Sequence, residues 1–255
     1  LRKEIGFSPE YYAGHSLGEY TALAACEKLS FRDALFLVCK RAKAMEDTVP
    51  AGFGGMLAVK ARDFDHLSKL CFELQDTSGR VLEIVNYNSP EQFVLSGHSD
   101  VIDEMAFILK KNKILAKKLP VSGPFHSSLM KPAREVLSEE IKKIHFFENE
   151  EKMIPNVLGA FKGHYDKSYL ISQMDNPVLW KDTLQSAFSH GCRAYVEFGP
   201  GKVLSSLVKK NCPKASFVFD TNDIVSSLKT LEKDLIAEDF LTSEQVDFFS
   251  KTVSN

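Results

Sequence analysis

The sequence lacks the features that mark membrane, disulfide-rich and metal-binding proteins. Its apolar runs fall short of the ~20 residues that cross a bilayer, and no signal-peptide pattern opens the chain. Its five cysteines are scattered, without the C-x-x-C spacing of a zinc site or the even number of a disulfide framework. We therefore expect a cytoplasmic protein with reduced thiols, no membrane association and no bound metal.

An excess of one charge is missing as well. The 32 lysines and arginines nearly balance 34 acidic residues, and 44% of the 255 residues are hydrophobic. The one basic cluster spans a predicted helix end and strand, at Lys110, Lys111, Lys113, Lys117 and Lys118. A solvated face is our preferred interpretation of it, and docking of an acidic protein is the alternative. The composition predicts a soluble globular protein of one or two domains that binds no nucleic acid.

The most informative segment that is present covers residues 14–20, Gly-His-Ser-Leu-Gly-Glu-Tyr. It sets Ser16 between two glycines where a strand ending at Ala13 gives way to a helix opening near Leu17, the geometry of a nucleophile elbow. The helix N-terminus would stabilise negative charge there. We expect Gly14 and Gly18 to keep Cβ atoms away from a neighbouring strand and from substrate. The bare five-residue pattern also fits a plain turn.

The full heptapeptide resembles the active-site signature of the malonyl-coenzyme A:acyl carrier protein transacylases and the acyltransferases of polyketide synthesis. Residues 123–133 are similar to the second signature of that family, and His126 falls on its catalytic histidine. Further similar segments are residues 86–90, 94–97 and 197–204. The resemblance covers about residues 1 to 220 and keeps its motifs in the expected order.

A serine needs a base within hydrogen-bond reach, and His126 is our candidate because it follows a Gly-Pro turn between a strand and a helix. The alternative is a loop histidine bonded to the backbone. The resemblance implies that Ser16 and His126 form a dyad. The segment containing Gln173 would accept a hydrogen bond from the distal imidazole nitrogen of His126. The alternative for Gln173 is a surface glutamine. His15 should point away from the nucleophile and support it indirectly. We interpret the other histidines as structural or exposed.

Arg41 lies in a helix that is predicted to start at a capping box, Ser30 and Asp33, and to end before Pro50. An arginine beside the buried face of a helix needs an anionic partner, most often in a structural ion pair. In the resembled family this arginine binds the free carboxylate of malonate through a fork of two hydrogen bonds. The resemblance therefore implies a malonyl substrate.

Two apolar neighbours of the catalytic residues, Phe125 and Leu17, are predicted to form a pocket wall that favours malonyl over methylmalonyl. The Leu17 backbone N–H should be one oxyanion donor, and the family takes the second from a glutamine-containing loop. The nucleophile comes so early that we expect such a segment to precede this chain. Asn88 is expected to line the thioester cleft with Asn86, although a turn explains asparagine there equally well.

The resemblance implies transfer of a malonyl group from malonyl-coenzyme A to the phosphopantetheine thiol of an acyl carrier protein, through an ester on Ser16 and in fatty acid or polyketide synthesis. No metal or redox cofactor is needed for such chemistry. Two alternatives stay open: a thioester hydrolase that uses the same elbow, and a non-catalytic fragment that binds the carrier protein.

The fold class we predict is α/β, with a parallel-sheet, hydrolase-like core and an inserted ferredoxin-like βαββαβ subdomain over residues 55–121. The subdomain has predicted strands at 56–59, 81–87, 92–96 and 114–119 and helices at 64–74 and 101–111, with a turn at 88–90. Residues 1–54 and 122–235 form the predicted large subdomain. In it, one helix carries Pro132 in its first turn and another starts at Asn176 and Pro177. Residues 236–255 are a predicted tail.

Overall fold

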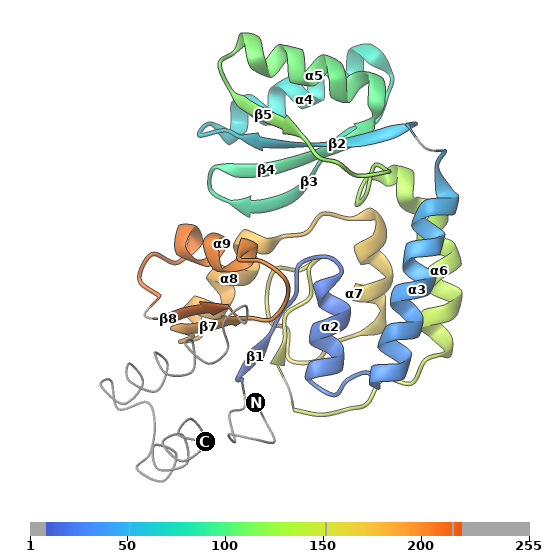
Figure 1. Ribbon diagram of the computed structural model, residues 1–255, viewed down its shortest axis with the longest axis vertical. Coiled ribbons are helices and arrows are strands. Elements are labelled where there is room, and N and C mark those ends of the chain that lie inside the picture. The colour runs from blue at the N-terminus through green and yellow to red at the C-terminus, as the bar shows by residue number, and fades with distance from the viewer. Residues whose placement is uncertain (1–8, 51, 151, 216, 221–255) are drawn as a thin grey trace. The chain divides into compact units, whose positions relative to one another are not determined.

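The computed structural model describes residues 9–50, 52–150, 152–215 and 217–220 (Figure 1). The fold is mixed α/β, with parallel and antiparallel sheets. Residues 11–187 form one compact unit, and the described residues among 1–10 and 188–255 belong to a second. The predicted tail at 236–255 lies outside the described residues.

Residues 54–118 of the first unit contain a four-stranded antiparallel sheet. Its strands are β2 (Gly54–Lys60), β3 (Leu82–Ser89), β4 (Gln92–His98) and β5 (Leu115–Lys118), in the order β3-β4-β2-β5. Two helices, α4 (Phe64–Ser78) and α5 (Ser99–Lys111), lie on one face of this sheet (Figure 1). The order strand, helix, strand, strand, helix, strand is the one that the sequence predicts for this segment.

Apolar residues alternate along these strands, as the period of two requires for a sheet with two different faces. Leu57 and Leu95 pack with the apolar residues of α4 and α5, and both are fully buried. Met56 and Val94, one position before each, belong to a separate cluster with Val85. Burying a leucine or valine side chain contributes about 1.5 to 3 kcal/mol, so this alternation fixes which face of the sheet meets the helices.

The turn between β3 and β4 differs from the prediction. The chain turns at Pro90 and Glu91, whereas Asn88 and Ser89 belong to β3 and are buried. The register shifts between Tyr87 and Ser89, so the strand carries an irregularity that admits an extra residue. The prediction of a turn at Asn88 was wrong because long-range packing overrode the turn preference of asparagine.

The remainder of the first unit is mainly helical. Its elements are α2 (Gly18–Ala25), α3 (Phe31–Thr48), the 3-10 helix η1 (Ser128–Met130), α6 (Lys131–Lys143), α7 (Lys167–Ser172), the 3-10 helix η2 (Gln173–Asp175) and α8 (Trp180–Ser189). The predicted capping box is confirmed, since the Ser30 hydroxyl accepts a hydrogen bond from the Asp33 N–H at 3.0 Å. Pro132 lies in the first turn of α6, as predicted.

The predicted start of α8 was wrong by several residues. Residues 176–179 are extended, and Val178 forms a parallel bridge with Asn86 of β3. The Tyr87 N–H donates to the Val178 carbonyl at 3.0 Å, and the Val178 N–H donates to the Val85 carbonyl at 2.8 Å. The segment therefore satisfies its backbone groups against the edge of the sheet instead of in a helix.

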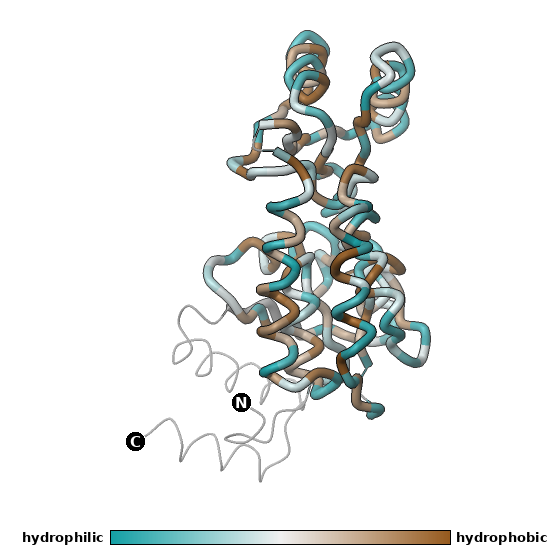
Figure 2. The backbone as a smooth tube through the Cα atoms, turned by 90° about the vertical axis from the view of Figure 1, so that its right-hand side faces the viewer, coloured by the Kyte–Doolittle hydropathy of each residue, from teal (hydrophilic) through white to brown (hydrophobic). Residues whose placement is uncertain are grey.

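The helices pack around an apolar cluster in which Tyr20, Leu23, Leu37 and Leu137 have at most 1% of their surface exposed. In Figure 2, where α3 and α6 face the viewer, apolar and polar stretches alternate along the helices. This pattern buries one stripe of each helix and leaves the other in water. None of the helices in the described ranges combines the length and apolar character needed to cross a membrane.

Two short parallel sheets complete the described fold. In the first unit β1 (Tyr11–Tyr12) pairs with β6 (Lys152–Met153). In the second unit β7 (Ala194–Glu197) pairs with β8 (Phe217–Asp220), and α9 (Val203–Asn211) connects them in a strand, helix, strand arrangement. Outside residues 55–121 the sequence predicts a mostly parallel sheet; there the described strands form two separate parallel pairs.

Candidate active site

Ser16 sits between β1 and the start of α2 with a φ of +52°, a left-handed conformation that is uncommon for any residue other than glycine. The side chain of Asn156 holds it there. Asn156 Oδ1 accepts a hydrogen bond from the Ser16 N–H at 2.7 Å, and Asn156 Nδ2 donates to the Gly14 carbonyl at 2.6 Å. The turn is therefore a strained elbow with the serine at its apex.

The two glycines of the elbow have different surroundings. A Cβ on Gly14 would lie 2.0 Å from the carbonyl carbon and oxygen of Gly18. The neighbour that requires a glycine is thus the first turn of the following helix; the expectation of a neighbouring strand was wrong. A Cβ on Gly18 would meet nothing within 4 Å.

His126 reaches the nucleophile from the loop that precedes η1. Its Nε2 lies 2.7 Å from Ser16 Oγ and its Nδ1 lies 2.9 Å from the backbone carbonyl of Gln173. A carbonyl only accepts, so Nδ1 carries the proton and Nε2 is the acceptor for the serine hydroxyl. Burial and the positive charge of Arg41 lower the pKa of His126 to about 3, so the imidazole is neutral and able to act as a base.

Gln173 contributes through two different groups. Its backbone carbonyl holds His126, whereas its side-chain Nε2 donates to the Ser16 carbonyl at 2.9 Å and to Glu19 Oε2 at 2.5 Å. The side chain is fully buried, so the alternative of a surface glutamine was wrong. One residue thus contacts both the nucleophile and the base.

Arg41 projects from α3 into the same site and is only 7% exposed. Its Nη2 donates to Ser16 Oγ at 2.8 Å. No carboxylate among the described residues lies within ion-pair distance of this guanidinium, and its Nε has no hydrogen-bond partner. The alternative of a structural ion pair was therefore wrong. Glu19 interacts with this guanidinium through its charge but makes no direct ion pair with it. A buried guanidinium without a direct ion-pair partner can receive an anionic ligand.

Leu17 caps α2, and its side chain is 48% exposed. Among the described residues, none accepts a hydrogen bond from its backbone N–H, whereas the Gly18 N–H donates to the His15 carbonyl at 2.9 Å. The Leu17 N–H is therefore available at the N-terminus of a helix, where the helix dipole adds a partial positive charge.

His15 points away from Ser16 Oγ, toward the four-stranded sheet. Its Nε2 lies 2.8 Å from Oδ1 of Asn88, and its ring meets that of Trp180 edge-on with centroids 5.5 Å apart. Burial lowers the pKa of His15, so the neutral ring donates this hydrogen bond. Asn88 thus supports the residue beside the nucleophile.

Phe125 is partly buried and packs against two clusters, the one between the helices and the buried cluster of Met56, Val85 and Val94. Its contact with the nucleophile's pocket stays a prediction, as does a wall shared with Leu17. The hydrogen bonds of Ser16 Oγ go to His126 and Arg41. His98 has a structural role, since its Nδ1 accepts a hydrogen bond from the Val81 N–H. The remaining histidines are exposed, as predicted: His66, His145, His164 and His190.

The sequence reasoning missed three residues of the site. Glu19 is fully buried in the first turn of α2, where Tyr165 donates to its Oε1 at 2.7 Å. Burial raises the pKa of Glu19 to about 7, against the opposing effect of its hydrogen bonds and of Arg41. Asn156, also fully buried, clamps the elbow. Glu19 lies inside the heptapeptide and could have been singled out; Asn156 and Tyr165 carry no signal of their own.

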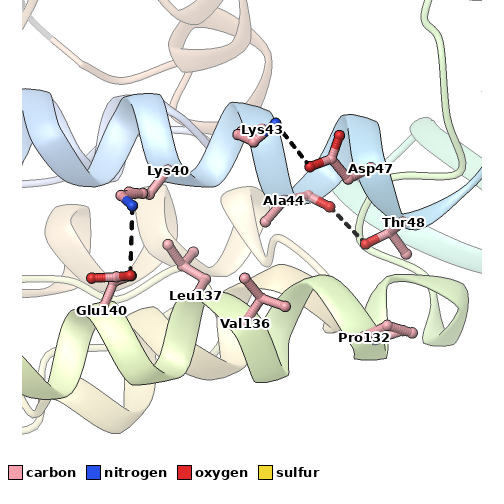
Figure 3. A pocket seen from close by; sticks show the side chains of 9 residues that line it. All are labelled: Lys40, Lys43, Ala44, Asp47, Thr48, Pro132, Val136, Leu137 and Glu140. Atoms are coloured by element: carbon pink, nitrogen blue, oxygen red, sulfur yellow. Dashed lines mark hydrogen bonds and ion pairs between the residues drawn. The ribbon is translucent and has the colours of Figure 1, made fainter.

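A groove lies between α3 and α6 (Figure 3). It is lined by Lys40, Lys43, Ala44, Asp47, Thr48, Pro132, Val136, Leu137 and Glu140, none of them a predicted site residue. Its charged groups are already paired, Lys40 with Glu140 at 3.6 Å and Lys43 with Asp47 at 3.2 Å. Over the part of the chain that the structure describes, no three His, Cys, Asp or Glu side chains gather as a metal site.

Comparison with known proteins places this site in a family. The acyl transferase domain family matches residues 1–252. The malonyl CoA-acyl carrier protein transacylase of Bacillus subtilis (strain 168) is 37% identical over 237 residues, which cover 91% of this chain and 74% of that protein.

Solved structures agree with this. The crystal structure of malonyl CoA-acyl carrier protein transacylase from Clostridium perfringens Atcc 13124 has a TM-score of 0.85 at 32% identity and covers 93% of this chain and 76% of its own. A malonyl-transacylase in complex with a type II polyketide synthase acyl-carrier protein has a TM-score of 0.82 at 32% identity, over 90% of this chain and 75% of its own. The chain is therefore a member of the acyl transferase domain family, a family of acyltransferases.

Proposed function

We propose that this protein transfers a malonyl group from malonyl-coenzyme A to the phosphopantetheine thiol of an acyl carrier protein, through an ester on Ser16. The observation that carries the proposal is that one serine oxygen is hydrogen-bonded to both a neutral imidazole and a buried guanidinium that has no direct ion-pair partner among the described residues. The names of the similar proteins support the same acyl group, donor and acceptor.

In the first half-reaction the Ser16 hydroxyl passes its proton to Nε2 of His126 while its oxygen attacks the thioester carbonyl. The Leu17 N–H is the donor that this chain offers to the resulting oxyanion. The carbon–sulfur bond then breaks, and the departing thiolate of coenzyme A takes the proton from Nε2. The Gln173 carbonyl keeps the imidazole in the required tautomer throughout.

Arg41 selects the acyl group. Its Nε and Nη2 lie on one edge of the planar guanidinium; Nε is unpartnered and Nη2 bonds only the serine hydroxyl. The free carboxylate of a malonyl group can accept from both in a fork. An acetyl group offers no such acceptor and leaves the cation uncompensated.

In the second half-reaction the carrier thiol gives its proton to His126 and takes the malonyl group from Ser16, which regains its hydroxyl. All proton transfers run through one imidazole, so the proposal requires no metal or redox cofactor. Phe125 and Leu17 are proposed to restrict the α-carbon and so favour malonyl over methylmalonyl, a difference of about 1 to 3 kcal/mol for one methyl group. His15 and Asn88 are proposed to border the thioester.

We also propose the finer organisation of the chain. Residues 55–121 form a ferredoxin-like subdomain inserted into a hydrolase-like large subdomain, residues 1–54 and 122–235, with residues 236–255 as a tail. The strand order β3-β4-β2-β5, with both helices on one face, supports the first part of this division. The cytoplasm is the proposed location, on the sequence features described above.

Intact-protein mass spectrometry tests the proposed function. Incubation with malonyl-coenzyme A should add one malonyl group to the protein, and Ser16→Ala should abolish the addition. Subsequent addition of a phosphopantetheinylated carrier protein should move the malonyl group onto the carrier. Rapid release of free malonate without the carrier would instead indicate a hydrolase, and the absence of any adduct would indicate a non-catalytic carrier-binding protein.

A further inference from the structure

We infer that Glu19 is a positioning residue, which acts through Gln173 and Asn156 to fix the position of the nucleophile Ser16 relative to the base His126. This inference deepens the proposed function and rests on it. It does not make Glu19 a catalytic residue, because its carboxylate contacts neither the serine hydroxyl nor the imidazole.

The surroundings of Glu19 are those of an anchor. Its carboxylate, fully buried, accepts from the Tyr165 hydroxyl at 2.7 Å, from Gln173 Nε2 at 2.5 Å and from the Asn156 backbone N–H at 3.4 Å. All three neighbours donate, so the arrangement fits the ionised carboxylate, which only accepts. The ionisable groups that face it are Tyr165, Tyr20 and Arg41. The negative charge is thus held by donors that belong to the site.

The first link from this anchor to the chemistry is Gln173. Its amide nitrogen has two hydrogens, and they go to Glu19 and to the Ser16 carbonyl. The same residue accepts from His126 Nδ1 through its backbone carbonyl. Its own Oε1 is buried without a partner, so the two acceptors on the nitrogen side set the orientation of the amide. A shift of Gln173 would move the nucleophile and the base together.

The second link is Asn156, which extends the parallel pairing of β1 and β6 into the elbow. The last regular bond of this pairing runs from the Ile154 N–H to the Tyr12 carbonyl at 2.9 Å. Two residues later, the Asn156 backbone N–H donates to Glu19. The side-chain amide of Asn156 accepts from the Ser16 N–H and donates to the Gly14 carbonyl, the two bonds that a peptide group of a neighbouring strand would otherwise make. A positive φ such as that of Ser16 costs about 1 to 3 kcal/mol and persists only when its surroundings hold it.

The variant that tests the inference is Glu19→Gln, which keeps the shape but turns one acceptor oxygen into an NH2 group facing donors. We expect the rate constant of seryl-ester formation to fall about 100-fold, the loss that a 1 Å displacement of a reacting group causes, with little change in KM. Each rate is divided by the fraction of folded molecules, which circular dichroism and titration of the adduct measure. A purely structural role would lower the folded fraction and leave the rate per folded molecule unchanged.

Two further variants keep the test independent of folding. Tyr165→Phe removes one donor from Glu19 and should lower the rate about 10-fold, the effect of one lost hydrogen bond of ~1.4 kcal/mol. Asn149→Ala is the matched control. Asn149 also joins distant segments, through the Cys26 carbonyl at 2.8 Å and Lys28 Nζ at 2.7 Å, but none of the described atoms of the site bonds to it. It should leave the rate per folded molecule unchanged.

The readout that does not depend on substrate is the nuclear magnetic resonance signal of the His126 Nδ1 proton, assigned by its loss in His126→Asn. Glu19→Gln should move or broaden it, whereas Asn149→Ala should not. An unchanged signal with an unchanged rate in a folded Glu19→Gln protein overturns the inference. If the wild-type protein forms no malonyl adduct, the proposed function fails, and this signal alone still decides whether Glu19 positions the pair.

Discussion

The four-stranded sheet and the helical body around Ser16 both enclose apolar clusters, but among the described residues only the body buries acidic or basic side chains beside its cluster. The sheet and its two helices enclose an apolar cluster, in which Leu57, Leu95 and Ile102 are fully buried. The body buries a glutamate, an arginine and a histidine within hydrogen-bond or charge range of one another. The first arrangement contributes stability through area removed from water. The second costs free energy for each polar group that is imperfectly paired.

The difference teaches where the function lies. Buried side-chain atoms without a hydrogen-bond partner occur in both regions: Asn86 Nδ2 and Ser96 Oγ lie in the sheet, and Arg41 Nε and Gln173 Oε1 lie beside the nucleophile. Of these four residues, Arg41 is the one that carries a charge. A protein that buries a cation without a direct ion pair gives up stability at that point, and a ligand can restore the lost interactions. The predictions below separate the two regions by asking which substitutions change chemistry and which change only folding.

The largest effect is expected for His126→Asn. Asparagine tolerates the left-handed backbone that His126 adopts, φ +64°, but cannot act as a base. Seryl-ester formation should fall about 1,000-fold, within the range that a general base contributes, while the circular dichroism spectrum stays that of the wild type. Stopped-flow or mass-spectrometric single-turnover measurement gives the rate. His145→Asn, an exposed histidine in ring contact with Phe147, is the control and should be silent.

Arg41→Ala should change specificity more than folding. Malonyl loading should fall about 100-fold, since two hydrogen bonds to a charged partner contribute ~1.5 kcal/mol or more each. Acetyl loading should be unchanged or faster, because no carboxylate is involved. Competition between malonyl- and acetyl-coenzyme A, read by mass spectrometry, measures the ratio directly. Arg32→Ala, an exposed position on the same helix, is the control, and an equal loss for both acyl groups would remove Arg41 from substrate selection.

Leu95→Ala tests the other side of the comparison. The side chain is fully buried against α4 and α5, so its truncation should lower the free energy of unfolding by about 2 to 5 kcal/mol. The rate of ester formation per folded molecule should change less than about twofold, because no site residue loses a partner. Urea unfolding and single-turnover kinetics are the two measurements. Phe107→Ala, at an exposed position of α5, should change neither, and a large kinetic effect of Leu95→Ala would show that the regions are coupled.

The sequence predicted the sheet segment well because its information is local. The period of two in the strands and the apolar spacing in the helices fix each element, and the element order then leaves few ways to pair them. The errors fall where distant residues decide. Asn88 was assigned to a turn from its own preference, yet its place in β3 and its bond to His15 depend on partners far away in the chain.

The site divides in the same way. Ser16, His126 and Arg41 could be found because each lies in a segment with a recognisable pattern. Asn156 could not, since an asparagine three residues after a short strand resembles many surface asparagines until the chain folds it against the elbow. The resemblance located Gln173 and its contact with His126, but the bonds of its side chain to Ser16 and Glu19 could not be foreseen, because they depend on segments far away in the chain. Burial of Glu19 becomes visible only with Tyr165 in place.

The smallest effect expected is a pH dependence of stability, and it concerns the body alone. The pKa of His126 is about 3 in the fold and 6.5 for an unperturbed imidazole, so the neutral ring contributes stability that is lost as pH falls below 6.5. The pKa of Glu19 is raised from 4.5 to about 7, so its contribution is present below pH 4.5 and is lost as pH rises through 7. Between pH 4.5 and 6.5 the two contributions to the free energy of unfolding change with pH in opposite directions.

When one of the two groups is removed, the free energy of unfolding should therefore show the pH dependence that the other group causes. In His126→Asn the free energy of unfolding, relative to the wild type, should rise by about 1 kcal/mol for each unit of pH lowered from 6.5 to 4.5. In Glu19→Gln it should fall by a similar amount over the same window, since only the histidine contribution remains. Urea unfolding at half-unit pH intervals measures both, and Leu95→Ala, which removes no titratable group, should run parallel to the wild type. Parallel curves for all three variants would mean that neither buried group keeps its shifted pKa, and the electrostatic distinction between sheet and body would disappear.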